Sequence, residues 1–415
     1  MSQTVIGKSF LGKPLTVDFI GNRKSSLKIF IIAGQHGDEK YSKEAVIKLA
    51  EYFKPKTKLS FHAAVLYNAN PDGYENNSRM NAQSIDLNRD HLLLQSKETE
   101  AIHNFVREWM PQIVIDIHNY PSRRRHLLKK HLIINQDIFI DIPTNLAVIQ
   151  PLNNNKIKEF FTKIKSDLNS KGFSCERYVL FQKSGKIRHS TLDVKDARNS
   201  LAMRYGVFSI ILEGREPLKK EGILGKNKTI MGQFHALGSV IDYLVKNRNE
   251  FESKPHVSTQ GELVPIQSKY RNSNERIELE VKDSKTKKTK KKKFKNYSPD
   301  VESLKFVDLP TSYAVPNSMK KLIKLLQKHG FSSSSNNKIN EYEMYYKISE
   351  KSPTKQLKKK TISNKISNYS VFPVNQLGGR FLALLLEPQS KFGLNRFSEL
   401  KLDFSKNLEF PIIRI

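Results

Sequence analysis

The chain has 415 residues, of which 38% are hydrophobic and 27% charged, and its formal net charge is +30. This length suits two or three domains, or one large domain with an appendage. The single cysteine, Cys175, excludes an intramolecular disulfide. The N-terminus has no basic segment followed by an unbroken apolar run, and no window approaches the ~18 apolar residues of a membrane span. We therefore expect a cytoplasmic protein without membrane association.

Residues 1–250 alternate between apolar strands and helical patterns. Strands are predicted at 27–33, 62–67, 113–117 and 208–212, and helices at 43–52, 99–109 and 229–246. Strands that are buried on both faces read as nearly continuous apolar runs. The alternation predicts an α/β domain with a mixed, mainly parallel sheet and helices on both faces.

Residues 251–300 are polar, and the run at 282–295 holds nine lysines with Asp283 as its only acid. Blocks of like charge usually stay solvated, so this segment is predicted to be a linker or a long loop. A basic run also suits nucleic acid or another polyanion. Because the rest of the chain is rich in lysine too, nucleic-acid binding is not expected to be the main function.

Residues 301–415 regain a regular pattern. An amphipathic helix is predicted within 316–329, closed by Gly330, and a Ser/Asn loop follows at 332–338. Residues 381–386 fit a buried strand or a short helix, and 402–415 alternate toward an apolar tail. These elements predict a small C-terminal module of α+β or β-rich type. The sequence carries no signal for the oligomeric state.

The first predicted strand leads into Gly-Gln-His-Gly-Asp-Glu at residues 34–39. His36 and Glu39 lie three residues apart at a strand-to-helix junction, so an imidazole nitrogen and a carboxylate oxygen can meet at one point. Zn²⁺ accepts both ligands at ~2.0–2.2 Å. The strand at 113–117 ends in His118, which offers a third ligand. Two ligands close in sequence, a third far away and one open position are usual for catalytic zinc.

Two further segments also stand near strand ends, where ligands of open α/β sheets gather. Asn-Pro-Asp-Gly at 70–73 is a turn signal, followed by Arg79 and then by Asp-Leu-Asn-Arg at 86–89. Arginines on such a loop can bind carboxylates through two hydrogen bonds. Glu213 follows an apolar strand directly, so its carboxylate must face solvent or a cleft, where it can act as general base and then general acid.

Taken in order, these segments resemble the zinc carboxypeptidase family, the carboxypeptidase A-like metallopeptidases, over residues 25–245. The shared pattern is His-x-x-Glu, then Asn-Pro-Asp-Gly with a following Arg, then Asp-Leu-Asn-Arg, a strand that ends in His and a strand that ends in Glu. The chain is most similar to compact microbial members, including those that act on murein-type peptides. Residues 374–388 are similar to an extension beside some microbial peptidase domains.

The resemblance implies a hydrolase that cleaves an amide bond next to a free carboxylate by metal-activated water. One zinc ion would be held by His36, Glu39 and His118. Zinc both acidifies the attacking water and polarises the scissile carbonyl.

The remaining roles follow from the same resemblance. Glu213 corresponds to the general base. Arg79 corresponds to the residue that steadies the oxyanion together with the metal. Asn88 and Arg89 correspond to the pair that binds the terminal carboxylate of the substrate.

The sequence departs from the family pattern at several positions. Asp90 and His91 stand where members commonly continue with Asn and an aromatic residue. The substrate-side tyrosine expected upstream of Glu213 is missing, because residues 189–191 read His-Ser-Thr; Tyr205 suits a structural role. Three arginines at 123–125 suit acidic substrates or a solvated face.

Three other readings stay open. A succinylglutamate desuccinylase or aspartoacylase-like N-acyl amino acid amidohydrolase shares the metal triad and the Asp-Leu-Asn-Arg-type loop, although the Asn-Pro-Asp-Gly turn favours a peptidase. The expected substrate is accordingly a peptide or an N-acyl amino acid. A polyanion or nucleic-acid-binding protein would use the lysine run, and an inactive peptidase would keep the fold as a binding module.

Overall fold

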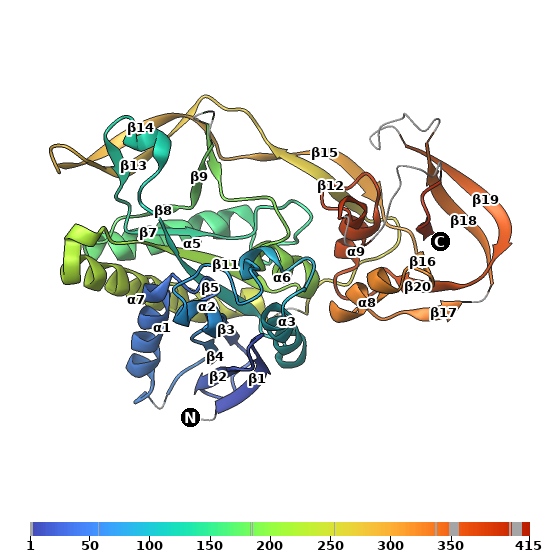
Figure 1. Cartoon of the computed structure of the whole chain (residues 1–415), viewed down its shortest axis with the longest axis horizontal. Helices are drawn as coiled ribbons and strands as arrows, with labels where there is room; N and C mark the ends of the chain where they lie inside the picture. Colours follow the sequence, from blue (N-terminus) through green and yellow to red (C-terminus); the bar gives the residue numbers. More distant parts are fainter. Residues whose placement is uncertain are drawn as a thin grey trace.

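The computed structural model describes residues 3–56, 58–182, 184, 186–252, 254–336, 338–347, 357–397, 400 and 409–415 (Figure 1). An eight-stranded sheet with the order β1-β2-β4-β3-β5-β11-β7-β8 forms the N-terminal region. Its strands are β1 Gln3–Lys8, β2 Pro14–Gly21, β3 Lys28–Ala33, β4 His62–Leu66, β5 Ile113–Tyr120, β7 Ile138–Asp141, β8 Cys175–Arg177 and β11 Phe208–Arg215. The central strands β4, β3, β5 and β11 are parallel, whereas β2 and β7 join them antiparallel. This confirms the predicted mixed sheet with a parallel centre.

Helices cover both faces of this sheet, as predicted (Figure 1). On one face lie α1 Lys40–Phe53, α5 Asn154–Ser170 and α7 Gly222–Lys246; on the other lie α3 Lys97–Trp109 and α6 Ala197–Tyr205. Strand β3 shows the cause, because Ile29 and Ile31 pack into the first layer and Phe30 and Ile32 into the second. Full burial of each such side chain contributes roughly 1.5–3 kcal/mol, so both layers hold the strand in place.

A second sheet packs on the carboxyl end of β5, where Tyr120 joins its core. Its order is β6-β13-β14-β10-β9. The strands are β6 Leu132–Ile134, β9 Val179–Phe181, β10 Ile187–His189, β13 Glu275–Asp283 and β14 Thr289–Ser298. Between β5 and β6 lies the short helix α4 Arg125–Leu128.

The segment 251–300, predicted to be a linker or loop, is therefore largely regular. It contains β12 Leu263–Tyr270 as well as β13 and β14. In β13, Ile277, Leu279 and Val281 are buried and the residues between them are not. This alternation is typical of a strand. The lysine-rich composition of the neighbouring residues nevertheless predicted a linker or loop.

The C-terminal region is an α+β arrangement. Strand β15 Val301–Asp308 pairs with β12, and a six-stranded sheet has the order β17-β20-β16-β21-β18-β19. Its strands are β16 Ser312–Pro316, β17 Ser334–Asn336, β18 Ile339–Tyr346, β19 Lys358–Ile366, β20 Tyr369–Pro373 and β21 Ile413–Arg414. The predicted amphipathic helix is α8 Lys320–Lys328, and residues 381–386 are helical, within α9 Gly379–Leu386. Part of the predicted 402–415 alternation lies outside the described residues.

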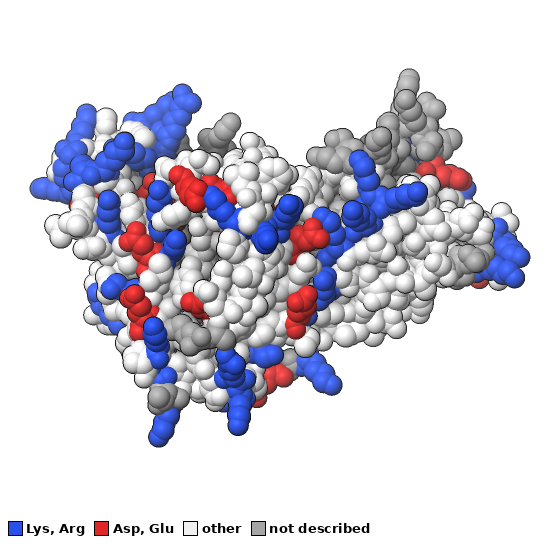
Figure 2. Space-filling model, turned by 60° about the horizontal axis from the view of Figure 1, so that its bottom comes forward, with Lys and Arg blue, Asp and Glu red and all other residues white. Residues whose placement is uncertain are grey.

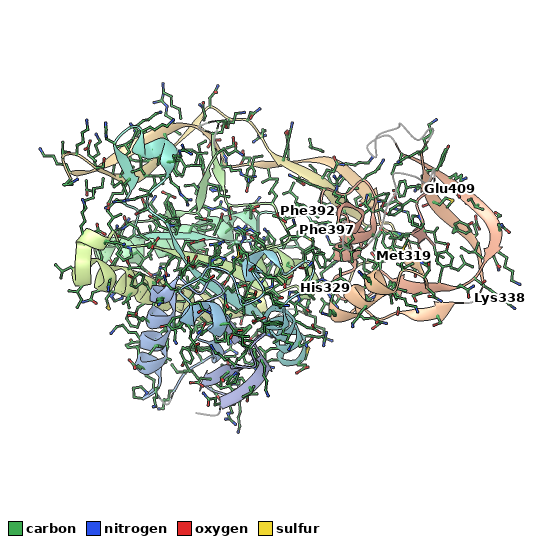
Figure 3. All side chains as sticks on the ribbon, in the orientation of Figure 1. Met319, His329, Lys338, Phe392, Phe397 and Glu409 are labelled. Carbon is green, nitrogen blue, oxygen red and sulfur yellow. The ribbon has the colours of Figure 1, made fainter. Side chains whose placement is uncertain are left out.

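The C-terminal region packs directly on the N-terminal one. Leu92 and Met203 share a hydrophobic core with Leu326 and Phe381. His329, at the end of α8, lies at this junction (Figure 3), and its Nε2 is 2.9 Å from the carbonyl oxygen of Leu92.

Among the described helices, none has the length and apolar character needed to cross a bilayer. The cytoplasmic location and the boundaries of the three predicted regions stay predictions.

Candidate active site

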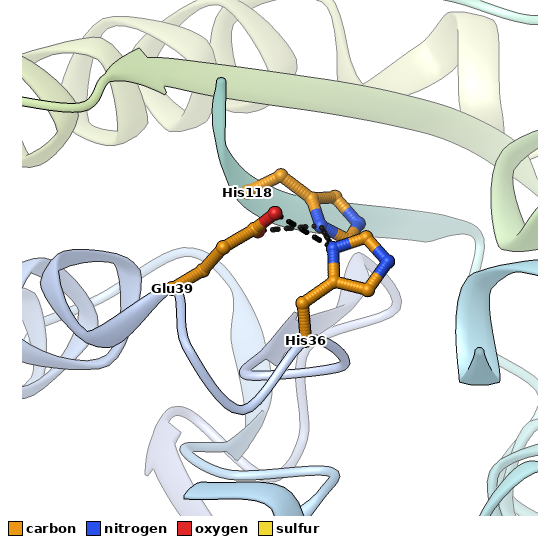
Figure 4. Close-up of side chains that lie close together, drawn as sticks. All are labelled: His36, Glu39 and His118. Carbon is orange, nitrogen blue, oxygen red and sulfur yellow. Dashed lines mark hydrogen bonds and ion pairs between the residues drawn. The ribbon is translucent and has the colours of Figure 1, made fainter. Parts of the chain in front are cut away.

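The three predicted metal ligands meet at the carboxyl ends of two neighbouring parallel strands. His36 and Glu39 lie in the loop between β3 and α1, and His118 lies on β5. Nδ1 of His36 is 2.7 Å from Oε1 of Glu39 and 3.1 Å from Nδ1 of His118. Nδ1 of His118 is 2.9 Å from Oε2 of Glu39, and all three side chains point toward one another (Figure 4). One oxygen and two nitrogens therefore converge on one point.

The Asn-Pro-Asp-Gly turn at 70–73 packs against the loop that carries His36 and Glu39. It forms the start of the short helix α2 Pro71–Glu75, where Oδ1 of Asn70 accepts the Gly73 N–H at 2.9 Å. Nδ2 of Asn70 donates to the carbonyl of Gln35 at 3.3 Å. A Cβ on Gly37 would lie 2.1 Å from the carbonyl carbon of Gly73, so only glycine allows this approach.

Two carboxylates that the sequence reading did not assign hold the histidines in place. Nε2 of His36 lies 3.0 Å from Oδ1 of Asp86, and Nε2 of His118 lies 2.8 Å from Oδ2 of Asp116. When a carboxylate accepts the Nε2–H, the Nδ1 of a neutral imidazole is available to a cation on the side of Glu39, as in metal sites whose histidines have carboxylate partners. The donor set and the tautomers therefore fit Zn²⁺.

The charges around the triad are strongly coupled. Burial lowers the pKa of His36 and of His118, but Glu39 together with Asp86 or Asp116 outweighs burial and raises both pKa values. Burial raises the pKa of Glu39, yet the two histidines lower it further than burial raises it. Without a cation, the carboxylates keep the imidazoles protonated. The site therefore favours a positive charge at the point where His36, Glu39 and His118 meet.

Glu213 lies on β11 in register with His118 on β5. Its side chain is buried, and burial raises its pKa; the charge of Glu39 acts in the same direction, whereas His118 and His36 oppose it. These interactions put the carboxylate beside the triad. A carboxyl group with a raised pKa can take up and return a proton near neutral pH.

Arg79 borders the triad. Its Nε and Nη2 bind Oδ2 of Asp86 at 3.0 and 2.9 Å, and its Nη1 lies 3.2 Å from Nδ1 of His36 and 3.6 Å from Oε1 of Glu39. The side chain is 40% exposed. It can therefore meet a ligand that enters from solvent.

Asn88 and Arg89 differ in their surroundings. Asn88 is buried in the 3-10 helix η1 Leu87–Arg89; its Oδ1 accepts the Ala197 N–H at 2.9 Å and its Nδ2 lies 3.0 Å from Nε2 of His118. The Oδ1 of this amide is thus engaged by the protein, and its Nδ2 lies beside the His118 ring. Arg89 is exposed, and its Nη1 donates to the carbonyl of Asn88 at 2.5 Å, which leaves most of its guanidinium accessible.

A buried polar row extends from the triad toward the C-terminal region. Gln35 donates from Nε2 to Oδ1 of Asp116 at 2.8 Å, and its Oε1 lies 2.7 Å from Nε2 of His91. Nδ1 of His91 is 3.1 Å from Nε2 of His103, whose Nδ1 is 3.0 Å from the hydroxyl of Tyr205. Tyr205 therefore lies at the far end of the row from the ligands.

Two further residues bear on the charges of the site: Tyr178, which the sequence did not predict, and Arg124, one of the three arginines at 123–125. Burial and the charge of Glu213 raise the pKa of Tyr178, while Arg124 and Arg89 act in the opposite direction. Tyr178 stands between β8 and β9, and Arg124 precedes α4. Tyr178 has no local sequence signal, because its position depends on the second sheet.

Comparisons with known proteins agree with the pattern of the site. Residues 1–123 match the model of the zinc carboxypeptidase family. Carboxypeptidase 2 of Trichophyton rubrum is 26% identical over 187 residues, 43% of this chain and 35% of that protein. Murein peptide amidase A of Escherichia coli (strain K12) is 37% identical over 100 residues, 24% of this chain and 39% of that protein. The chain thus spans only 35–39% of the length of these two relatives.

Among solved structures, a metallo-carboxypeptidase from Pseudomonas aeruginosa in complex with (2-guanidinoethylmercapto)succinic acid is 17% identical, with a TM-score of 0.44, over 60% of this chain and 64% of that chain. The family model covers His36, Glu39 and His118 but ends before Glu213. Over its first 123 residues, the chain is similar to the zinc carboxypeptidases.

Proposed function

We propose that the chain is a zinc-dependent, metallocarboxypeptidase-like hydrolase that cleaves an amide bond next to a free carboxylate. The observation that carries this proposal is the convergence of His36, Glu39 and His118 within 4.8 Å, with Glu213 beside them. A zinc ion bound there supplies Lewis acidity toward the attacking water and the scissile carbonyl.

Glu213 moves the proton in this proposal. Its carboxylate takes a proton from the attacking water and then gives it to the leaving amine, so that the carboxylate is restored at the end of the cycle. Its burial supports this role, because the raised pKa makes the protonated state accessible. General acid–base catalysis of this kind contributes about 10²–10⁴-fold in rate.

Two arginines bind the negative charges of the reaction. Arg79, oriented by Asp86, donates to the oxyanion that forms from the scissile carbonyl. Arg89, the more accessible of the predicted pair, binds the terminal carboxylate of the substrate. Asn88, whose amide is buried beside His118, supplies the carbonyl that binds Arg89.

An N-acyl amino acid amidohydrolase remains the second candidate, since it would need the same triad. The Asn-Pro-Asp-Gly turn that supports the ligand loop favours a peptidase. The two functions differ in their products: a peptidase releases a C-terminal residue from a peptide, and the amidohydrolase releases an acyl acid from a single amino acid.

The test combines metal content with product analysis. We expect one zinc per chain after purification without chelators, and release of C-terminal residues from a peptide library detected by mass spectrometry. Release of acyl acids from N-acyl amino acids, without action on peptides, would support the second candidate. Protein without stoichiometric zinc, or with neither product, would contradict both.

A further inference from the structure

A dense positive surface lies on the hairpin formed by β13 and β14, defined here as the basic hairpin, residues 275–298 (Figure 2, upper left). Its strands pair antiparallel and enclose a turn at 284–288. Seven of its lysines are exposed: Lys285, Lys287, Lys288, Lys290, Lys291, Lys293 and Lys295. Blocks of this kind create a field that attracts polyanions and steers their approach.

The charge of the basic hairpin is not neutralised within the described part of the chain. Lys282 is its one lysine in a salt bridge, with Oε1 of Glu221 at 3.3 Å. Only Glu278 and Glu280 stand opposite lysines in the register. Lysines at an exposed strand edge commonly serve to prevent edge-to-edge aggregation. Lysines on one face of the strand would be enough to prevent such aggregation, whereas residues 290–293 place lysines on both faces of β14.

The basic hairpin is joined to the loop that leaves the metal site. Strand β13 pairs with β6, and the Ser284 N–H donates to the carbonyl of His131 at 2.8 Å. The chain between β5 and β6 adds exposed Arg125, Lys129 and Lys130. Two basic segments, residues 124–130 and the hairpin, are therefore joined by this pairing and are defined here together as the basic track.

At its other end the basic track reaches the catalytic groups. Arg124, directly before α4, follows β5, the strand that carries the ligand His118 and runs beside Glu213 and Arg215 of β11. Two exposed acids, Asp38 and Glu216, lie close to Glu39 instead. The surroundings of the site are thus divided, basic on the side of the second sheet and acidic near the start of α1.

We infer that the basic track selects acidic polypeptides, whose C-terminal residue enters the metal site while acidic residues upstream of the scissile bond bind the basic hairpin. This inference rests on the proposed function and deepens it by naming the substrate class. A polypeptide is favoured over a nucleic acid because the track begins at the end of β5, the strand that carries His118 in register with Glu213, where an amide would be cleaved.

The experiment uses the full zinc-loaded chain and two peptides of equal length with the same C-terminal dipeptide. One carries a run of glutamates upstream of that dipeptide, and the other carries glutamines. The hairpin variant replaces Lys285, Lys288, Lys290 and Lys295 by Gln. The matched control replaces four exposed lysines that lie on α5, at its end and on α8, namely Lys158, Lys171, Lys320 and Lys324.

For the unaltered chain we expect kcat/KM to be about tenfold higher for the glutamate peptide at low ionic strength, and the ratio to fall toward one in high salt. The hairpin variant should lose most of this ratio, through KM, and the control should keep it. All three proteins should share one kcat on the glutamine peptide. Equal kcat/KM for both peptides in the unaltered chain, or an unchanged ratio in the hairpin variant, overturns the inference.

A binding experiment tests this inference separately from the proposed function. If neither peptide is cleaved, the proposed function fails, and fluorescence anisotropy with the labelled glutamate peptide still tests the surface. Binding that the hairpin variant loses and the control keeps supports the surface. Binding equal in both variants overturns it, as does duplex DNA that binds through the hairpin more tightly than the glutamate peptide.

Discussion

Two buried groups of histidines lie close together in this molecule and have opposite electrostatics. The metal pair, His36 and His118, faces carboxylates on both sides of each ring. The neutral trio consists of His91, His103 and His329, and its ring nitrogens contact an amide, one another, a tyrosine hydroxyl and a backbone carbonyl. The same side chain thus serves a reactive centre in one place and a packed junction in the other.

The difference shows that burial alone does not decide the state of a histidine. Burial lowers the pKa of His91 to about 4 and that of His329 to about 3, and no neighbouring charge reverses this. In the metal pair, carboxylates reverse the effect of burial. Where carboxylates turn both Nδ1 atoms toward one point, a cation site results.

The largest effect should come from breaking the metal pair itself. His118→Gln removes one of three ligands, so we expect loss of stoichiometric zinc and of measurable turnover, because an open site cannot compensate for a missing ligand. Zinc content by mass spectrometry and peptide hydrolysis measure the two effects. His329→Gln is the matched control and should retain both zinc and turnover. Equal zinc loss in the two variants would refute the distinction between pair and trio.

The next effect separates metal binding from proton transfer. Glu213→Gln keeps the shape of the side chain but cannot accept a proton, so kcat should fall by about 10²–10⁴-fold while zinc stays at one per chain. Unchanged turnover in the zinc-loaded variant would remove Glu213 from the reaction.

Asp116→Asn makes the surroundings of His118 resemble those of the trio. Without the carboxylate, the Nε2–H of His118 loses its charged acceptor, and zinc affinity should fall by about 10–100-fold. Competition with a chelator of known affinity measures this loss. Gln35, which contacts the same aspartate, supplies a comparison: Gln35→Met should weaken zinc less than Asp116→Asn.

Acid should destabilise the trio. Since His91 and His329 have folded-state pKa values of about 4 and about 3, and unfolded histidines titrate near 6.5, the unfolded state binds more protons between these values. The free energy of unfolding should therefore fall as the pH drops from about 6.5 to about 4, on the order of 3 kcal/mol for His91 alone. Urea titrations of zinc-free protein at several pH values measure it. The raised pKa values of the metal pair act in the opposite direction, since they contribute stability that is present at low pH and is lost as the pH rises.

The smallest effect is the cost of changing the trio at neutral pH. His329→Gln loses ring packing against His103, at a centroid distance of 5.4 Å, and strains the contact with the Leu92 carbonyl. We expect about 1–3 kcal/mol less stability by urea unfolding at pH 7. A loss larger than that caused by removing zinc would mean that the trio, and not the metal, dominates the stability of the junction.

The sequence predicts the centre of the sheet and the convergence of His36, Glu39 and His118, because apolar runs and strand ends are short-range signals. The partners of these residues are less accessible. Asp116 stands two residues before His118 on one strand and therefore on the same face, a signal that was present but ambiguous. The bond from Ala197 to Asn88 spans 109 residues, and no local pattern announces it. The strands of the basic hairpin were not predicted, because the lysine-rich composition of this segment outweighed the alternation of apolar residues in β13.

Gln35 gives the buried row a direction. A carboxylate only accepts, so the amide nitrogen must face Asp116 and the amide oxygen must accept the Nε2–H of His91. Nδ1 of His91 then accepts from His103, and His103 accepts from the hydroxyl of Tyr205. Every hydrogen in the row points toward the ligand end, and an added proton on either ring would set two hydrogens against each other. The row can therefore transmit orientation to the metal site.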